Sequence, residues 1–192
     1  MTKPIGAIVL AAGFSSRFGS SKLLAKLSNG KSVFQQTTER IAEAFPHRLV
    51  VTRPEMAAAL QELSPGTSVL SFEHAEQGMG ATLAFAVQSI AHWKGCVVCL
   101  GDMPFIETST YRCIAEQVTD ESIVTPMFDS RMGNPVAFGK QFFPDLGALT
   151  GDSGGRRITS MHPLAVRELQ VSDPGILQDI DTLEELALYQ DS

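Results

Sequence analysis

Short runs of apolar, often β-branched residues alternate along this chain with segments in which apolar residues recur at helical spacing. The run Gly95–Leu100 is continuously apolar, as is typical of a central strand that helices cover on both faces. Strands that alternate with helices form right-handed βαβ units. The pattern therefore predicts an α/β fold: a doubly wound, mostly parallel sheet with helices on both faces, in three layers (α/β/α).

Turn residues and prolines delimit the predicted elements, and the 192 residues contain no linker or repeat, so one domain over residues 1–192 is expected. The predicted strands are Ile5–Leu10, Arg48–Thr52, Ser68–Phe72, Gly95–Leu100, Ser122–Thr125, Pro135–Phe138 and Ala165–Val171. The predicted helices are one capped by Ser32 and ended by Pro46, then Pro54–Leu63, Gly80–His92, Thr108–Val118, Phe142–Leu149, Gly154–His162 and Thr182–Tyr189.

The charge of the chain argues against nucleic acid as a partner. The formal net charge is −6, and lysines and arginines do not cluster, whereas a general nucleic-acid binder needs a basic face. The N-terminus lacks a signal-peptide layout, and no apolar run is long enough to span a bilayer. We therefore expect a cytoplasmic protein without a membrane partner.

Three cysteines are too few, and odd in number, for a disulfide framework. Cys96 and Cys99 have CxxC spacing, but they lie in the predicted strand Gly95–Leu100. Residues three apart on a strand point to opposite faces, so these two thiols cannot grip one metal ion. They are predicted to be small buried apolar residues.

A loop rich in glycine and serine, Leu10–Leu24, follows the first predicted strand. Gly13 and Gly19 can adopt conformations closed to other residues, and successive N–H groups in such a turn form a concave site for phosphate oxygens. Arg17 and Lys22 add two positive charges. The loop matches neither GxxxxGK[ST] nor GxGxxG. It predicts a phosphate site of another kind, the alternative being an ordinary turn with solvated charges.

An acidic residue follows the central strand in Gly101-Asp102-Met103-Pro104. Ligands of open parallel sheets bind at the carboxyl ends of the strands, so Asp102 is expected at the same edge as the glycine-rich loop. Mg²⁺ commonly takes one or two carboxylates together with phosphate oxygens. Asp102 is therefore predicted to bind a metal ion, the alternative being a solvated turn residue.

A second carboxylate is expected because one carboxylate rarely fixes a metal ion alone. The candidates are Asp179 and Asp181, which share a face if the chain is extended there. Asp181 or Thr182 is also a good helix N-cap, with Glu184 or Glu185 completing a capping box. Asp181 can serve both purposes only through different oxygens.

Three further segments combine glycines with polar residues. In Gly78–Thr82 two glycines at a helix start allow a flat base to approach exposed backbone N–H groups. Asn134 carries a donor and an acceptor suited to a heterocycle or a phosphate. Gly151–Arg156 is a glycine-rich turn at the start of a helix, and it ends in an arginine. Both features suit an anion site. For each segment the alternative is a structural role as a turn or a cap.

The segment Leu10–Leu24 resembles the LAAGxSxRxGxxKLL signature of the molybdenum cofactor nucleotidyltransferase family. The resemblance covers almost the whole chain. Four further motifs of the family have counterparts here: GDMP, GMGxS with Thr82 in place of serine, GNPV, and GDxGAR with Gly155 in place of alanine. The family's DxDTPED pattern is matched less well, since Leu183 replaces the proline and Glu185 the last aspartate. Guanylyltransferases of the family usually have a second glycine where Ala12 stands, so the resemblance is closest to the cytidylyltransferases.

The resemblance implies a Rossmann-like nucleotidyltransferase fold and assigns roles to particular residues. Lys22, Arg17 and Asp102 would be catalytic, with Lys22 stabilising charge on the α-phosphate. Asp102 and, by comparison with related transferases, Asp181 rather than Asp179 would bind Mg²⁺, with Mn²⁺ as the other candidate ion. The implied nucleotide-binding residues are Leu10, Ala11, Ala12, Gly13, Arg17, Lys22, Gly78, Gly80 and Thr82. The implied acceptor-binding residues are Asn134, Asp152, Gly154 and Arg156.

The implied reaction is transfer of CMP from CTP to the terminal phosphate of molybdopterin or molybdenum cofactor, with release of pyrophosphate and a molybdenum hydroxylase as the recipient of the product. An anionic phosphate needs no general base to attack, which agrees with the lack of an evident His or Cys nucleophile. Alternatives are a related transferase that uses GTP or a sugar or lactyl phosphate, and a noncatalytic cofactor carrier or nucleotide sensor. An intact metal site and Lys22 favour catalysis.

Overall fold

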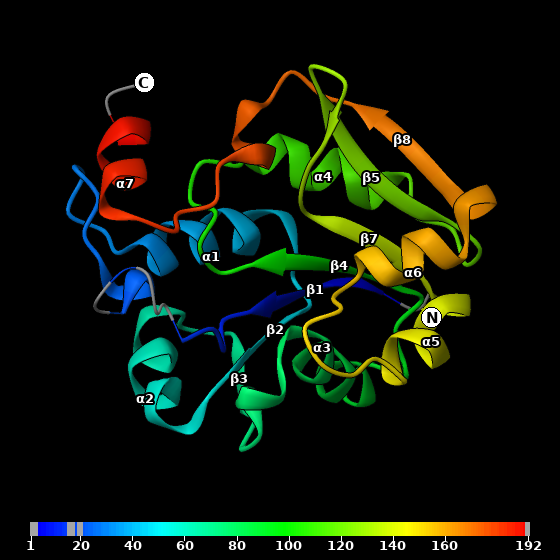
Figure 1. Cartoon of the computed structure of the whole chain (residues 1–192), viewed down its shortest axis with the longest axis horizontal. Coiled ribbons are helices and arrows are strands. Elements are labelled where there is room, and N and C mark those ends of the chain that lie inside the picture. Colours follow the sequence, from blue (N-terminus) through cyan, green and yellow to red (C-terminus); the bar gives the residue numbers. More distant parts are fainter. Residues whose placement is uncertain (1–3, 15–17, 19–20, 191–192) are drawn as a thin grey trace.

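The computed structural model describes residues 4–14, 18 and 21–190 and contains an eight-stranded sheet at its centre (Figure 1). The strand order is β3-β2-β1-β4-β7-β5-β6, and β8 pairs with β5. The first four strands are parallel to one another, as are β5 and β8. The bounds are β1 Ile5–Leu10, β2 Arg48–Thr52, β3 Ser68–Ser71, β4 Gly95–Leu100, β5 Ile123–Phe128, β6 Arg131–Met132, β7 Val136–Gly139 and β8 Val166–Gln170.

Helices cover both faces of the sheet and build a separate core on each. Apolar side chains of α1, α2 and α4 pack in one core, and those of α3, α5 and α6 pack in the other. The predicted three-layer, doubly wound α/β fold is thereby confirmed. No helix within the described residues is long and apolar enough to cross a membrane. The bounds are α1 Val33–Ala44, α2 Pro54–Leu63, α3 Met79–Gln88, α4 Thr108–Glu116, α5 Phe143–Gly147, α6 Arg156–Met161 and α7 Leu183–Gln190.

Strand β1 shows how the sequence divides between the two cores. Ala7 and Val9 face the core of α1, α2 and α4, whereas Ile8 faces the opposite core. The same alternation separates Cys96 from Cys99 on β4, and both are buried. Burial raises the pKa of both thiols. The prediction that these cysteines are buried and point to opposite faces is confirmed.

Helix α1 begins and ends where the sequence predicts. The Ser32 hydroxyl accepts a hydrogen bond from the backbone N–H of Gln35 at 3.1 Å, which satisfies one of the free donors of the first turn. Phe34 and Ile41 are fully buried. The helix ends at Ala44, before Pro46, whose ring has no N–H to continue it.

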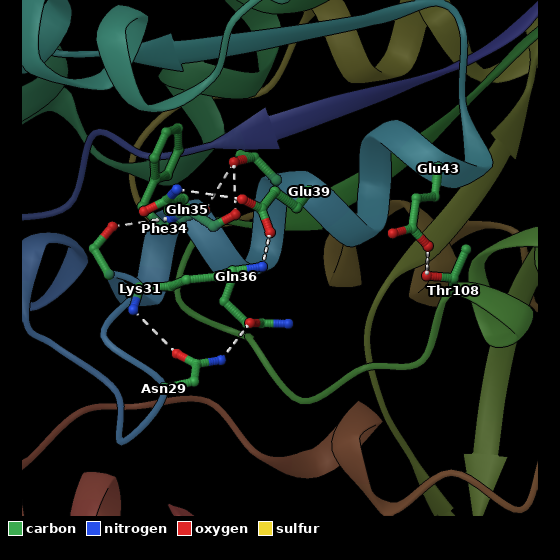
Figure 2. Close-up of polar contacts among 10 residues, drawn as sticks. Asn29, Lys31, Phe34, Gln35, Gln36, Glu39, Glu43 and Thr108 are labelled. Atoms are coloured by element: carbon green, nitrogen blue, oxygen red, sulfur yellow. Dashed lines mark hydrogen bonds and ion pairs between the residues drawn. The ribbon is translucent and has the colours of Figure 1, made fainter.

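The exposed side of α1 carries a set of polar contacts, drawn in Figure 2. Lys31 pairs with Glu39, to which Gln35 also donates a hydrogen bond. The Thr108 hydroxyl donates to Glu43 at 2.9 Å and so joins the start of α4 to α1. These contacts lie on the surface, and exposed ion pairs of this kind contribute little to stability.

Strand β7 departs from the parallel pattern, since it lies between β4 and β5 and is antiparallel to both. Residues 129–135 alone connect β5 to β7, and they contain β6 and a tight turn in which Asp129 and Ser130 have φ of 48° and 62°. A parallel connection needs about a dozen residues or more, so this link is too short for one. The predicted strand Ser122–Thr125 is also too short, because β5 continues to Phe128.

Candidate active site

The predicted glycine-rich loop and Asp102 emerge side by side from the sheet. Strands β1 and β4 are parallel neighbours with Leu10 opposite Leu100, so their carboxyl ends coincide. The register continues one step further, as Gly101 N–H donates to the carbonyl of Leu10 at 2.9 Å. The short loop after β4 therefore delivers Asp102 to the start of the loop after β1.

Lys22 connects two acidic side chains at this edge. Its Nζ lies 2.6 Å from Asp102 Oδ2 and 2.7 Å from Asp181 Oδ1. Two carboxylates from distant parts of the sequence thus converge on one cation. Burial lowers the pKa of Lys22, but the charges and hydrogen bonds of Asp102 and Asp181 outweigh it, and the net pKa is raised. Burial and the nearby Asp179 raise the pKa of Asp102, although Lys22 opposes them.

The segment that carries Asp181 is fixed against Asp102 through the backbone. The Ile180 N–H donates to the Asp102 carbonyl at 3.1 Å, and the Ile180 side chain packs in a small apolar cluster with Phe18 and Leu186. Phe18 belongs to the glycine-rich loop and Leu186 to α7. The C-terminal helix and the loop therefore hold the Asp181 segment between them.

The sequence offers Asp181 or Thr182 as the N-cap of the last helix, and the structure gives this role to Thr182. The Thr182 hydroxyl accepts from the Glu185 N–H at 3.1 Å, and a Glu185 carboxylate oxygen accepts from the N–H groups of Thr182 and Asp181 at 2.9 and 2.8 Å. This is the capping box, with Thr182 as its first member. The Asp181 carboxylate reaches Lys22.

The donor set fits a small divalent cation that also binds phosphate. Asp102 Oδ1 is buried without a hydrogen-bond partner among the described residues, and Asp102 and Asp181 already meet at a common cation, the Lys22 ammonium. Within the described residues no three His, Cys, Asp or Glu side chains gather as a metal cluster. Two carboxylates completed by phosphate oxygens and water are the ligands that Mg²⁺ usually takes.

A small pocket of about 80 Å³ adjoins Asp102. Ala12 lies in its wall and is 7% exposed, so its methyl group takes up space there. Thr82 also lines it, but its hydroxyl donates to the Gly78 carbonyl at 3.0 Å, which leaves the oxygen as an acceptor only. Among the described residues, its lining consists of Leu10, Ala12, Met79, Thr82, Leu100 and Asp102.

Gly78 and Gly80 pack against Gly151–Gly154. The segment predicted to bind the nucleotide is thus in contact with a segment predicted to bind the acceptor. The Gly80 N–H donates to the Gly151 carbonyl at 2.7 Å. A Cβ on Gly80 would lie within 2.9 Å of three carbonyl oxygens, and Gly78 has φ of 98° with Asp152 Oδ1 close by. These glycines are therefore required by backbone contact between the two segments, in addition to any role in base binding.

A larger cleft of about 820 Å³ opens beside the small pocket and contains all four predicted acceptor residues, Asn134, Asp152, Gly154 and Arg156. Its apolar lining includes Val98, Val136 and Phe138, and the first turn of α6 adds a second arginine, Arg157. Three residues line both spaces, so the pocket and the cleft are contiguous; they are Leu10, Met79 and Leu100.

Three residues complete the description of the site: Arg157, Asp179 and Arg17. Arg157 was not predicted, although its place next to Arg156 in a glycine-led first turn could have indicated it. Asp179 lines the larger cleft, whereas Asp181 reaches Lys22. Arg17 lies outside the described residues.

Comparison with known proteins places this geometry in a family. The sequence profile described as the MobA-like NTP transferase domain matches residues 7–167. The purine catabolism protein PucB of Bacillus subtilis is 29% identical over 189 residues, which cover 93% of this chain and 92% of that protein. A probable molybdenum cofactor guanylyltransferase of Thermococcus sibiricus is 34% identical over 57% of this chain and 54% of its own length.

Solved structures agree with this placement. The crystal structure of Rv0371c from Mycobacterium tuberculosis superposes with a TM-score of 0.86 at 28% identity, covering all of both chains. A second structure of that protein, described as a complex with manganese, gives a TM-score of 0.85 at 26% identity, again over both full chains. The profile match spans most of the sequence and includes the glycine-rich loop and Asp102. The chain belongs to the MobA-like NTP transferase family and is a nucleotidyltransferase.

Proposed function

We propose that the whole chain acts as one nucleotidyltransferase domain that transfers CMP from CTP to the terminal phosphate of molybdopterin or molybdenum cofactor. The observation that carries this proposal is the continuity of two spaces at one edge of the sheet. The small pocket lies beside Asp102 and the start of the glycine-rich loop, where the nucleotide would bind, and the larger cleft has room for an extended acceptor. A transfer reaction needs its two substrates to meet at one point. The two spaces adjoin at Leu10 and Leu100, and there the nucleotide and the acceptor would meet.

The reaction joins the acceptor phosphate to the α-phosphorus of the nucleotide. An acceptor phosphate oxygen attacks the α-phosphorus, the new P–O–P bond forms, and the bond to the β-phosphate breaks to release pyrophosphate. The attacking oxygen is already anionic at neutral pH and gives up no proton. The protein therefore contributes position and charge neutralisation in place of a nucleophile.

Charge neutralisation falls to Lys22 and to the divalent ion that Asp102 and Asp181 would hold. Lys22 lies at the end of the glycine-rich loop, where its ammonium can take up charge on the α-phosphate. Mg²⁺ or Mn²⁺, held by Asp102 and Asp181, would supply positive charge to the phosphate oxygens. The description of the Rv0371c structure as a manganese complex supports a divalent ion in this family fold.

The acceptor assignment is supported by the chemistry of the larger cleft. Molybdopterin joins a flat heterocycle to a terminal phosphate. The apolar side chains of Val136 and Phe138 suit the heterocycle, and the guanidinium groups of Arg156 and Arg157 suit the anion. The Thermococcus relative named a molybdenum cofactor guanylyltransferase supports the same acceptor. A molybdenum hydroxylase as the recipient of the product is part of the proposal.

The choice of CTP rests on Ala12. Its methyl group lies in the wall of the small pocket, where it leaves less room for a purine than the glycine of the guanylyltransferases would. The relative named a guanylyltransferase makes GTP the alternative to be tested.

A pyrophosphate-release assay tests the proposed function. The protein is incubated with Mg²⁺ and either CTP or GTP, and the acceptor is molybdopterin, molybdenum cofactor, or a sugar or lactyl phosphate. We expect release that requires the acceptor and is at least about tenfold faster with CTP, which corresponds to about 1.4 kcal/mol of discrimination. Faster release with GTP would overturn the base assignment. Release only with a sugar or lactyl phosphate would overturn the acceptor, and no release with any pair would favour a carrier or sensor.

A further inference from the structure

The start of the glycine-rich loop is held by the residues at the end of β2. The buried Thr52 hydroxyl donates to the Ala11 carbonyl at 2.9 Å, and the Ala11 N–H donates to the Val51 carbonyl at 2.9 Å. Hydrogen bonds between the end of β2 and the chain after β1 thus continue beyond Leu10 and Val51, the last paired residues of the two strands. The contact fixes the backbone at the point where the loop leaves the sheet.

Arg53, the next residue after β2, makes further contacts with the glycine-rich loop. Its Nη1 donates to the Gly13 carbonyl at 2.6 Å, and its guanidinium lies over the Phe14 ring, 4.9 Å from the ring centre. The Arg53 side chain is only 15% exposed, and its Nε is 3.7 Å from a Glu55 carboxylate oxygen. Two neighbouring loop residues are therefore held by one planar side chain.

These contacts determine which way the loop's N–H groups point. In a trans peptide the C=O and the following N–H point in opposite directions. Thr52 and Arg53 draw the carbonyls of Ala11 and Gly13 towards the β2–α2 junction. The N–H groups of Ala12 and Phe14 consequently face away from that junction, as donors of a phosphate-binding loop must.

We infer that Arg53 is a positioning residue that pre-orders residues 11–14 of the loop for the triphosphate. It acts through the Gly13 carbonyl and the Phe14 ring and need not touch the nucleotide. An ordered loop binds an anion without the cost of fixing its backbone at the moment of binding. This inference rests on the proposed role of the loop in triphosphate binding, but on no choice of base or acceptor.

The test uses the Arg53→Met and Arg53→Lys variants of the full chain, with inorganic triphosphate and Mg²⁺ as the probe in calorimetry. The matched control is Arg112→Met, which removes another arginine-to-carbonyl bond, from Arg112 to Glu43, away from the site. Hydrogen exchange of a peptide covering residues 11–14 is measured in the ligand-free proteins, and Tm is recorded for each.

We expect Arg53→Met to raise the Kd for triphosphate about tenfold and to speed exchange at residues 11–14, with Tm close to that of the wild type. Arg53→Lys should fall between the two, and Arg112→Met should match the wild type. Full affinity in Arg53→Lys would show that charge alone matters and would overturn the positioning role. Wild-type affinity in Arg53→Met would overturn the inference and leave the proposed function standing. Failure of the wild type to bind triphosphate would overturn both.

Discussion

The Asp102→Asn variant is expected to lose at least about a thousandfold in kcat, equivalent to roughly 4 kcal/mol of transition-state stabilisation. Asparagine keeps the shape of the side chain but removes the charge that pairs with Lys22 and that would bind the metal ion. The fold should be retained, because Lys22 keeps its partner Asp181 and no hydrogen bond to Oδ1 is lost within the described residues. Steady-state pyrophosphate release and circular dichroism measure the two effects.

The neighbouring acids provide the matched controls for this prediction. Asp181→Asn should lower kcat by about a hundredfold or more, since it removes the second carboxylate at Lys22. Asp179→Asn removes the same charge from the cleft, but among the described residues the partners of Lys22 are Asp102 and Asp181. Its kcat should therefore stay within about tenfold of the wild type. If Asp179→Asn is the more damaging of the two, the metal site has been assigned to the wrong aspartate. Full activity in Asp102→Asn would remove the metal assignment altogether.

The Lys22→Met variant should show two opposite effects. Its kcat should fall about 10²- to 10³-fold, because the cation that takes up α-phosphate charge is gone. Its affinity for Mn²⁺ in the absence of nucleotide should rise, because the ammonium no longer competes for Asp102 and Asp181. Calorimetric titration with Mn²⁺ and the shift of Tm on adding Mn²⁺ both report the second effect.

A lysine of the same charge outside the site separates these effects from a general loss of positive charge. Lys31 pairs with Glu39 on the exposed side of α1 (Figure 2), and Lys31→Met should leave both kcat and Mn²⁺ affinity unchanged. Weaker Mn²⁺ binding in Lys22→Met than in the wild type would contradict the view that Lys22 and the metal ion share the two carboxylates.

Much of the fold follows from local patterns in the sequence. The bounds of β1, β2, α2 and β4 match the prediction because each is delimited by a strong local signal: proline at the start of α2, and glycine directly after β4. Strand pairing is not a local property. The antiparallel placement of β7 depends on the short link through residues 129–135, whose length was the available signal.

The candidate site was predictable where a polar residue or a glycine-rich loop comes just after a predicted strand. Asp102 follows the most apolar strand after a single glycine, and the glycine-rich loop follows the first strand, so the parallel sheet brings them together. The contact between Lys22 and Asp181 spans 159 positions and depends on how α7 packs against Phe18, which no local pattern encodes. Arg53 was missed for a related reason: a single arginine before a helix-starting proline carries no motif, and its role arises only from the pairing of β2 with β1.

A crystal of the protein grown with Mn²⁺ and a nonhydrolysable CTP analogue provides the most direct test of the central claim. Anomalous scattering locates the Mn²⁺, and the electron density locates the triphosphate. We expect an anomalous peak coordinated by Asp102 and Asp181, with the triphosphate against residues 11–14 and Lys22 and with cytosine beside Ala12. A peak coordinated elsewhere, or a triphosphate bound away from the loop, would contradict it.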